Sequence, residues 1–146
     1  MACAPAASLR TVAFAGLLTA AVLAVYLNAL HGPFLFDDDV NIVRNGFLRI
    51  DQLTPDTAAH VWNAPHPSRR RKLSNFTFAL NYLGCGLEPH CYRLVNIGIH
   101  AFSALLAFAF FSQALDVEWL RNRFGSRRFW IAWGAAALWA LHPINL

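Results

Sequence analysis

Three consecutive carboxylates, Asp37, Asp38 and Asp39, are the residues of this sequence best suited to chemistry. They follow Phe34-Leu35-Phe36, shortly after an apolar run that is long enough to cross a bilayer. Like charges this close repel, so the cluster favours a basic partner or a hard divalent cation such as Mg²⁺ or Mn²⁺. A carboxylate held in this way can act as a general base. The alternative is an acidic cap, because carboxylates stabilise the first turn of a helix.

A basic run, Arg69-Arg70-Arg71-Lys72, is the second candidate for chemistry. Arginine offers two parallel donors to a phosphate or pyrophosphate, so the run fits a phosphate clamp. A solvated loop that contacts lipid headgroups is the alternative. The neighbouring Asn75-Phe76-Thr77 matches the N-glycosylation pattern.

The composition indicates an all-α integral membrane protein. Of the 146 residues, 57% are hydrophobic and 14% are charged, and the hydrophobic residues are clustered. The net charge of +4 does not indicate a nucleic-acid partner, because the basic residues lie mostly in loops beside apolar spans, where they set topology or contact lipid.

Three transmembrane helices are expected, at residues 11–30, 94–115 and 129–146. A cleaved signal peptide is the alternative for the first, although it is longer than a usual signal core. The third reaches spanning length only at its last residue, so we expect a truncated helix, with a short three-helix protein as the alternative.

The remaining segments give the orientation. The connection 116–128 carries four arginines, and short basic loops stay in the cytoplasm. Residues 1–10 are then cytoplasmic, and the 63-residue loop 31–93 is extracytoplasmic, with interfacial helices expected at 51–62 and 74–83. The pattern fits a multi-pass protein of a bacterial inner membrane or the endoplasmic reticulum.

Polar residues inside the expected spans form a third candidate group. Asn96, His100 and Ser103 share one helical face, and His142 is expected in the same outer half of the membrane as the acids. This shared depth predicts a common polar site with Asp37 and Asp38. For each histidine, an inter-helix hydrogen bond is the alternative.

The sequence holds three cysteines, too few for a disulfide framework or a CxxC zinc module. Cys85 and Cys91 are separated by five residues, with Gly84 and Gly86 allowing a turn. They either pair or remain two independent thiols.

Four ordered blocks resemble the membrane region of the transmembrane and tetratricopeptide-repeat proteins, members of the GT-C glycosyltransferase superfamily linked to protein O-mannosylation. The blocks are Tyr26-Leu27-Asn28 with Gly32-Pro33-Phe34-Leu35-Phe36-Asp37-Asp38; Leu73-Ser74-Asn75-Phe76-Thr77-Phe78-Ala79-Leu80-Asn81-Tyr82; Tyr92-Arg93-Leu94-Val95-Asn96 with His100; and Ala140-Leu141-His142-Pro143-Ile144.

The resemblance implies that Asp37 and Asp38 form a catalytic pair, which leaves Asp39 as the expected cap. It also implies a polyprenyl-phosphate sugar donor, whose phosphate Arg71 and Lys72 would bind, and a protein hydroxyl or another acceptor. A divalent cation, held by Asp37 and Asp38 if at all, stays open.

Two departures matter. The family usually has Arg-Pro-Leu where this chain has Arg71-Lys72-Leu73, so the basic position remains without the rigid turn. GT-C enzymes also have many more spans, so we expect an N-terminal fragment that is inactive alone. The alternative is a small non-enzymatic membrane subunit that docks a partner.

Overall fold

The computed structural model describes residues 8–65 and 70–143, and within these ranges it contains helices and no strand. The elements, in chain order, are α1 (Leu9–Tyr26), η1 (Leu27–His31), η2 (Asp39–Val43), η3 (Gly46–Leu48), α2 (Pro55–Trp62), α3 (Lys72–Cys85), α4 (Pro89–Ala114), α5 (Glu118–Phe124), η5 (Gly125–Arg127) and α6 (Arg128–Ala140). The expected all-α class is confirmed. The chain divides into two units, Met1–Ala29 with Asn96–Leu146 and Leu30–Val95, which are described separately.

Two helices are long and apolar enough to cross a membrane. One is the continuous helix Leu9–His31, made of α1 and η1, and the other is α4, Pro89–Ala114. Both have a mean hydropathy of 2.0, and 17% and 22% of their most apolar windows are buried within the chain. The third expected span contains α6, whose 13 residues give a length of about 20 Å. The count of three spans remains a prediction.

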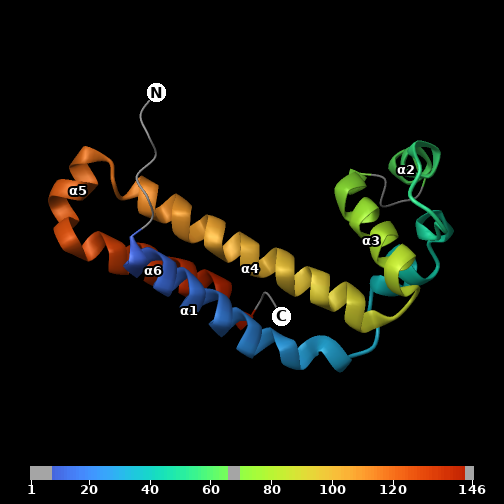
Figure 1. Ribbon diagram of the computed structural model, residues 1–146, viewed down its shortest axis with the longest axis horizontal. Coiled ribbons are helices and arrows are strands. Elements are labelled where there is room, and N and C mark those ends of the chain that lie inside the picture. Colours follow the sequence, from blue (N-terminus) through green and yellow to red (C-terminus); the bar gives the residue numbers. More distant parts are fainter. Residues whose placement is uncertain (1–7, 66–69, 144–146) are drawn as a thin grey trace. The chain divides into compact units, whose positions relative to one another are not determined.

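The first unit is held together by small and medium side chains on one face of each helix. Leu18, Val22 and Tyr26 recur every four residues on α1 and are buried. Ala132, Ala136 and Ala140 do the same on α6, each fully buried. Alanines at this spacing let helix backbones approach closely, which is the usual way that helices associate in membranes. Within this unit, α6 runs beside α1 (Figure 1).

Aromatic rings also join α1 to α6 in the first unit. The Phe14 ring meets the rings of Phe129, Trp130 and Trp133 edge-on, with centroids 5.1 to 5.6 Å apart. The Trp133 indole N–H donates to the Phe14 carbonyl oxygen at 3.1 Å. The Arg10 guanidinium lies 4.0 Å from the Phe129 ring centroid, a cation–π contact. Much of the expected loop 116–128 is folded as α5 and η5.

The second unit has its own small core. Its buried members are Leu48, Ile50, Val61 and Ala79, and the side chains of Phe76 and Phe78 pack against them. The core therefore joins η3, α2 and α3, which contain or adjoin those residues. Helices occur where interfacial helices were expected, as α2 and α3, although their position in a membrane remains a prediction.

Two local signals explain how α2 begins and how α3 leads into α4. Thr54 and Thr57 form a reciprocal capping box, and Pro55 occupies the first helical position, where its missing N–H costs nothing. After α3, Gly86 adopts φ +61°, a conformation that a residue with a Cβ rarely takes. The Tyr92 hydroxyl donates to the Gly86 carbonyl oxygen at 2.9 Å and fixes this turn.

Candidate functional site

The three aspartates lie at the start of η2, a single π-helical turn in the second unit. The Arg44 N–H donates to the Asp39 carbonyl oxygen five residues earlier, at 2.8 Å. Such turns are frequent at functional sites. Although the three acids are consecutive in sequence, each carboxylate has a different partner.

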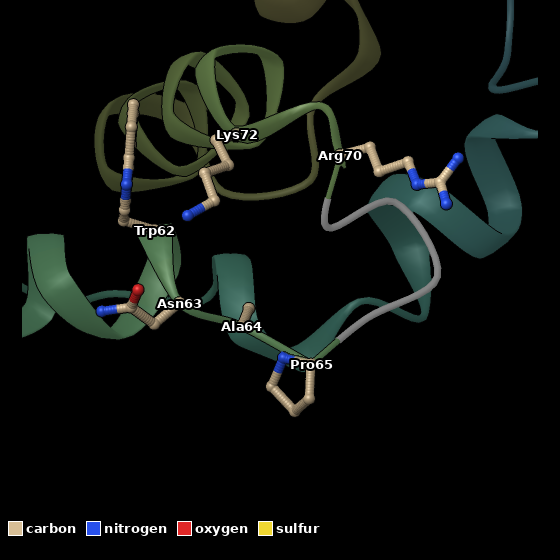
Figure 2. A pocket seen from close by; sticks show the side chains of 6 residues that line it. All are labelled: Trp62, Asn63, Ala64, Pro65, Arg70 and Lys72. Atoms are coloured by element: carbon tan, nitrogen blue, oxygen red, sulfur yellow. The ribbon is translucent and has the colours of Figure 1, made fainter.

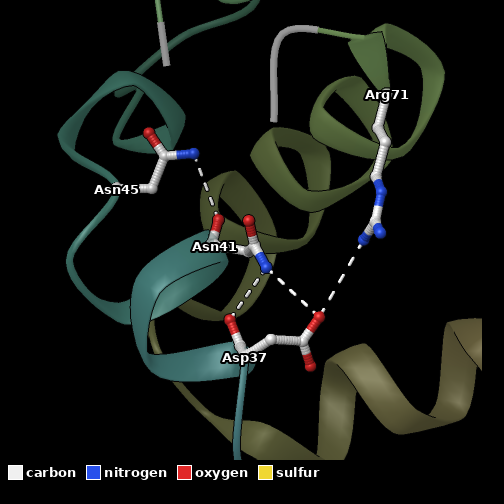
Figure 3. Close-up of polar contacts among 4 residues, drawn as sticks. All are labelled: Asp37, Asn41, Asn45 and Arg71. Carbon is white, nitrogen blue, oxygen red and sulfur yellow. Dashed lines mark hydrogen bonds and ion pairs between the residues drawn. The ribbon is translucent and has the colours of Figure 1, made fainter. Parts of the chain in front are cut away.

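Asp37 faces the basic run. Its Oδ2 lies 3.9 Å from Nη1 of Arg71, and both side chains are mostly exposed, at 72% and 67%. The Asn41 amide donates to the same Oδ2 at 3.3 Å and to the Asp37 carbonyl oxygen at 2.9 Å. Figure 3 shows Asp37 between Asn41, on its own turn, and Arg71, which immediately precedes α3. This arrangement leaves a negatively charged oxygen accessible to solvent and held by two donors.

Two asparagines, Asn41 and Asn45, connect this turn by hydrogen bonds to the buried part of the second unit. Asn45 is only 1% exposed, and its amide donates to the Asn41 carbonyl oxygen at 3.1 Å (Figure 3). Its side-chain oxygen accepts from the Phe47 N–H at 3.3 Å, which caps η3. The positions 37, 41 and 45 are therefore linked, although nothing in their residue types identified Asn41 as part of the site.

Asp38 and Asp39 do not act as side-chain caps. Asp38 occupies the N-cap position of η2 but makes no capping bond into the turn, and its Oδ2 instead accepts from the Leu35 N–H at 3.1 Å. Asp39 pairs with Arg44, with Oδ2 and Nε 2.8 Å apart. The expectation that Asp39 caps a helix is wrong, because a turn with a five-residue repeat places Asp39 and Arg44 together.

The residue before the acids is in a strained conformation. Phe36 has φ +49°, in the left-handed region, and is 93% exposed. A non-glycine residue pays about 1–2 kcal/mol for this conformation. Strain of this kind concentrates at functional sites, where the surroundings enforce it. Phe36 lies in a turn immediately before Asp37, which the Asp38 N–H closes by donating to the Leu35 carbonyl oxygen at 3.0 Å.

Lys72, the second predicted phosphate ligand, does not point in the same direction as Arg71. Its ammonium lies 5.3 Å from the Trp62 ring centroid. Together with Trp62–Pro65 and Arg70 it lines an open pocket of about 420 Å³ (Figure 2). In that view Lys72 points toward Trp62, whereas Arg70 points away from it. Arg69 lies outside the described residues. Arg71 and Lys72 therefore do not form one clamp in this structure.

The polar residues of the expected spans lie in the first unit, with Asn96 at its boundary. The His100 Nε2 lies 2.8 Å from the Ala140 carbonyl oxygen, to which it must donate because a carbonyl carries no proton. The Tyr26 hydroxyl donates to the same oxygen at 3.0 Å. His100 thus makes the inter-helix hydrogen bond that was its alternative role, whereas Asn96 and His142 are exposed. A common site with the acids remains a prediction, because the acids belong to the other unit.

The described residues include no group of three or more histidine, cysteine or acidic side chains able to hold a metal ion. Asp37 and Asp38 have different partners, and whether they hold a cation stays open.

A disulfide joins Cys85 at the end of α3 to Cys91 in the first turns of α4, with their Cα atoms 6.4 Å apart. Beside it, the Arg93 guanidinium donates to the Pro33 carbonyl oxygen. A Cβ placed on Gly32 would lie 3.0 Å from that guanidinium, so the absence of a side chain permits this approach. These contacts connect the start of α4 to the segment that precedes the acids.

The chain is similar to several protein O-mannosyl-transferases. It is 32% identical over 140 residues to protein O-mannosyl-transferase Tmtc1 of Drosophila melanogaster, covering 90% of this chain and 15% of that protein. It is 31% identical over 140 residues to TMTC3 of Mus musculus, covering 88% and 13%, and 32% identical over 137 residues to TMTC2 of the same species, covering 84% and 14%.

The chain therefore spans only 13 to 15% of the length of these relatives. No family model matches the chain, and no solved structure matches it. What the comparisons establish is a relationship to part of each of these proteins: the chain is a homologue of a segment of the protein O-mannosyl-transferases.

Proposed function

We propose that this chain supplies the acidic pair and an adjoining phosphate-binding side chain to a membrane glycosyltransferase of the GT-C type. The enzyme would transfer a sugar, mannose in the first instance, from a polyprenyl-phosphate donor to a protein hydroxyl. The similarity to protein O-mannosyl-transferases supports the class of reaction. The observation that carries the assignment to this site is the exposed Asp37 carboxylate held by Arg71 and Asn41.

In this mechanism Asp37 is the general base. It takes the proton of the acceptor hydroxyl as the hydroxyl oxygen attacks the anomeric carbon of the sugar. The bond from that carbon to the donor phosphate oxygen breaks, and the phosphate leaves with the electron pair. The Arg71 guanidinium is suited to neutralise the leaving phosphate through two parallel N–H···O bonds. Asp38 shapes the turn through its bond to Leu35 N–H.

Lys72 has a supporting role in this proposal. Its ammonium lines the pocket beside Trp62, where an apolar ring and a positive charge together suit an amphiphilic phosphate ester. The membrane placement is proposed on the same basis: three spans, a cytoplasmic N-terminus, and the Leu30–Val95 unit on the extracytoplasmic side, in an endoplasmic-reticulum or bacterial inner membrane. Asn96, His100 and His142 would then line the outer half of the helix bundle.

The test is sugar transfer by membranes that contain the product of the complete open reading frame. Asp37→Asn should lower turnover by about 10²–10⁴, because an amide cannot accept the proton. Asp38→Asn should lower turnover as well, because a neutral amide accepts the Leu35 N–H more weakly than a carboxylate does and holds the turn before the base less firmly. Asp39→Asn, which breaks only the pair with Arg44, should change turnover by no more than a few-fold. Equal activity of all three variants would contradict the proposal and favour a non-enzymatic membrane subunit.

A further inference from the structure

Arg71 is the residue on which two roles of the proposed site converge. It pairs with the carboxylate proposed as the base, and it belongs to the basic run proposed to bind the donor phosphate. The Arg71 guanidinium has five N–H donors, but a carboxylate paired with it offsets the positive charge that attracts a phosphate. The two anions therefore compete for Arg71.

The observed contact suits a temporary partner. The closest N···O distance is 3.9 Å, longer than the 2.7–2.9 Å that is typical of a charge-assisted hydrogen bond. Both side chains are mostly exposed, and exposed ion pairs contribute little free energy. The other exposed pair on the same turn, Asp39 with Arg44, is much closer at 2.8 Å. The Asp37–Arg71 pair is thus the looser of the two.

Asp37 would stay oriented if Arg71 left it. The Asn41 amide binds both the carboxylate and the carbonyl oxygen of Asp37, and Asn41 is itself linked to the buried Asn45. Both contacts are within η2 and its flanks, so they do not depend on α3. The turn can therefore hold the carboxylate in place without the guanidinium.

Resting on the proposed function, we infer that Arg71 is exchanged between Asp37 and the phosphate group of the donor. In the absence of donor the guanidinium is paired with Oδ2 of the carboxylate. When the polyprenyl phosphate binds, Arg71 moves to the phosphate and the Asp37 carboxylate becomes available to the acceptor hydroxyl. The base is thereby released only when the donor is in place, and the same cation then neutralises the leaving phosphate. No bond other than hydrogen bonds and ion pairs changes in this exchange.

The exchange predicts that Asp37 and a phosphate compete for Arg71. The experiment measures equilibrium binding of farnesyl phosphate to the chain in lipid nanodiscs, with farnesol as the control for the apolar tail and inorganic phosphate as the control for the free anion. Asp37→Asn should tighten farnesyl phosphate binding by about two- to fivefold, because the competing pair is lost. Arg71→Gln should weaken it by about tenfold or more, and the double variant should behave like Arg71→Gln.

Asp39→Asn is the matched control, because it removes the same charge from the same turn without touching Arg71. It should leave the affinity closer to that of the unmodified chain than Asp37→Asn does. If Arg71→Gln weakens binding but Asp37→Asn has no more effect than Asp39→Asn, the exchange is refuted while the phosphate site stands. If Arg71→Gln leaves the affinity unchanged, both the exchange and the proposed phosphate role of Arg71 fail.

Discussion

The Tyr26 hydroxyl and the His100 imidazole share one acceptor, the carbonyl oxygen of Ala140, at 3.0 and 2.8 Å. The Tyr26 and His100 rings are themselves in contact, with centroids 4.8 Å apart. Because Ala140 is the last residue of α6, its carbonyl has no acceptor role within that helix. Side chains from α1 and α4 therefore donate hydrogen bonds to the last carbonyl oxygen of α6. All three helices meet at this one atom.

This shared acceptor predicts a non-additive loss of stability. Tyr26→Phe and His100→Leu should each lower the free energy of unfolding by about 1 kcal/mol, because the other donor still serves the carbonyl. The double variant should lose more than the sum, since a buried carbonyl without a partner costs about 1–3 kcal/mol. Unfolding in mixed detergent micelles gives the free energy of unfolding of the unmodified chain, the two single variants and the double variant.

Ser103→Ala is the control for this cycle, because the Ser103 hydroxyl donates to Ile99 within its own helix. It should have little effect on unfolding. Strictly additive losses at Tyr26 and His100 would show that the two donors act separately.

The disulfide predicts a specific thiol count. Under denaturing conditions, protein from an oxidising compartment should react with one maleimide before reduction and with three afterwards, the first being at Cys3. Replacing both Cys85 and Cys91 with serine should lower the free energy of unfolding by an amount near the low end of about 2–4 kcal/mol, because the closed loop is short. Three reactive thiols before reduction would refute the pairing.

Asn75 illustrates how burial alters the meaning of a motif. The Asn75-Phe76-Thr77 pattern predicts a glycan, but Asn75 is 3% exposed within α3. We therefore expect no glycosylation at this position in microsomes. The double substitution Asp51→Asn with Leu53→Thr places the same pattern in an exposed bend and should add one glycan that endoglycosidase removes.

The two glycosylation results separate folding from topology. A glycan on the unmodified chain would contradict the burial of Asn75. Failure to modify the engineered pattern, with a glycosylation site appended to the N-terminus modified instead, would place the Leu30–Val95 unit in the cytoplasm and reverse the proposed orientation.

Phe36 predicts a gain in stability. Phe36→Gly relieves a left-handed backbone that costs about 1–2 kcal/mol, against an entropic cost of glycine of about 0.5–1 kcal/mol. We expect the free energy of unfolding to rise by up to about 1.5 kcal/mol. Phe36→Ala also removes the ring, which is 93% exposed, but it keeps the Cβ and with it the backbone strain. It should therefore give no such gain in the free energy of unfolding. A loss of stability in Phe36→Gly alone would show that the conformation is not strained.

The sequence predicted the helices well and the contacts between them poorly. Apolar runs indicated helices at 11–30 and 94–115, and the structure has them at Leu9–His31 and Pro89–Ala114. The second begins earlier because Pro89 suits a first helical turn. The Tyr26–Ala140 bond could not be predicted, because its acceptor is a backbone atom 114 residues away that any residue type would supply.

The candidate site shows the same division. The acids and the basic run were identified by residue type, but the partners of each acid depend on η2, whose five-residue hydrogen bond departs from the 3.6-residue period used to read helices. Arg71 and Lys72 are adjacent in sequence, yet one faces Asp37 and the other faces Trp62. Arg71 precedes α3 and Lys72 is the first residue of that helix, and the two side chains leave the backbone in different directions. A run of like charges therefore does not imply a single binding site.

The π-helical turn at Asp39–Val43 has a consequence for how this segment tolerates insertions and deletions. Removing one residue would let the turn close with ordinary four-residue bonds and would rotate everything after it by about 100°. Arg44 would leave the face of Asp39, and the buried Asn45 would turn away from its place between Asn41 and Phe47. Among related sequences, this stretch should therefore vary in residue type more readily than in length.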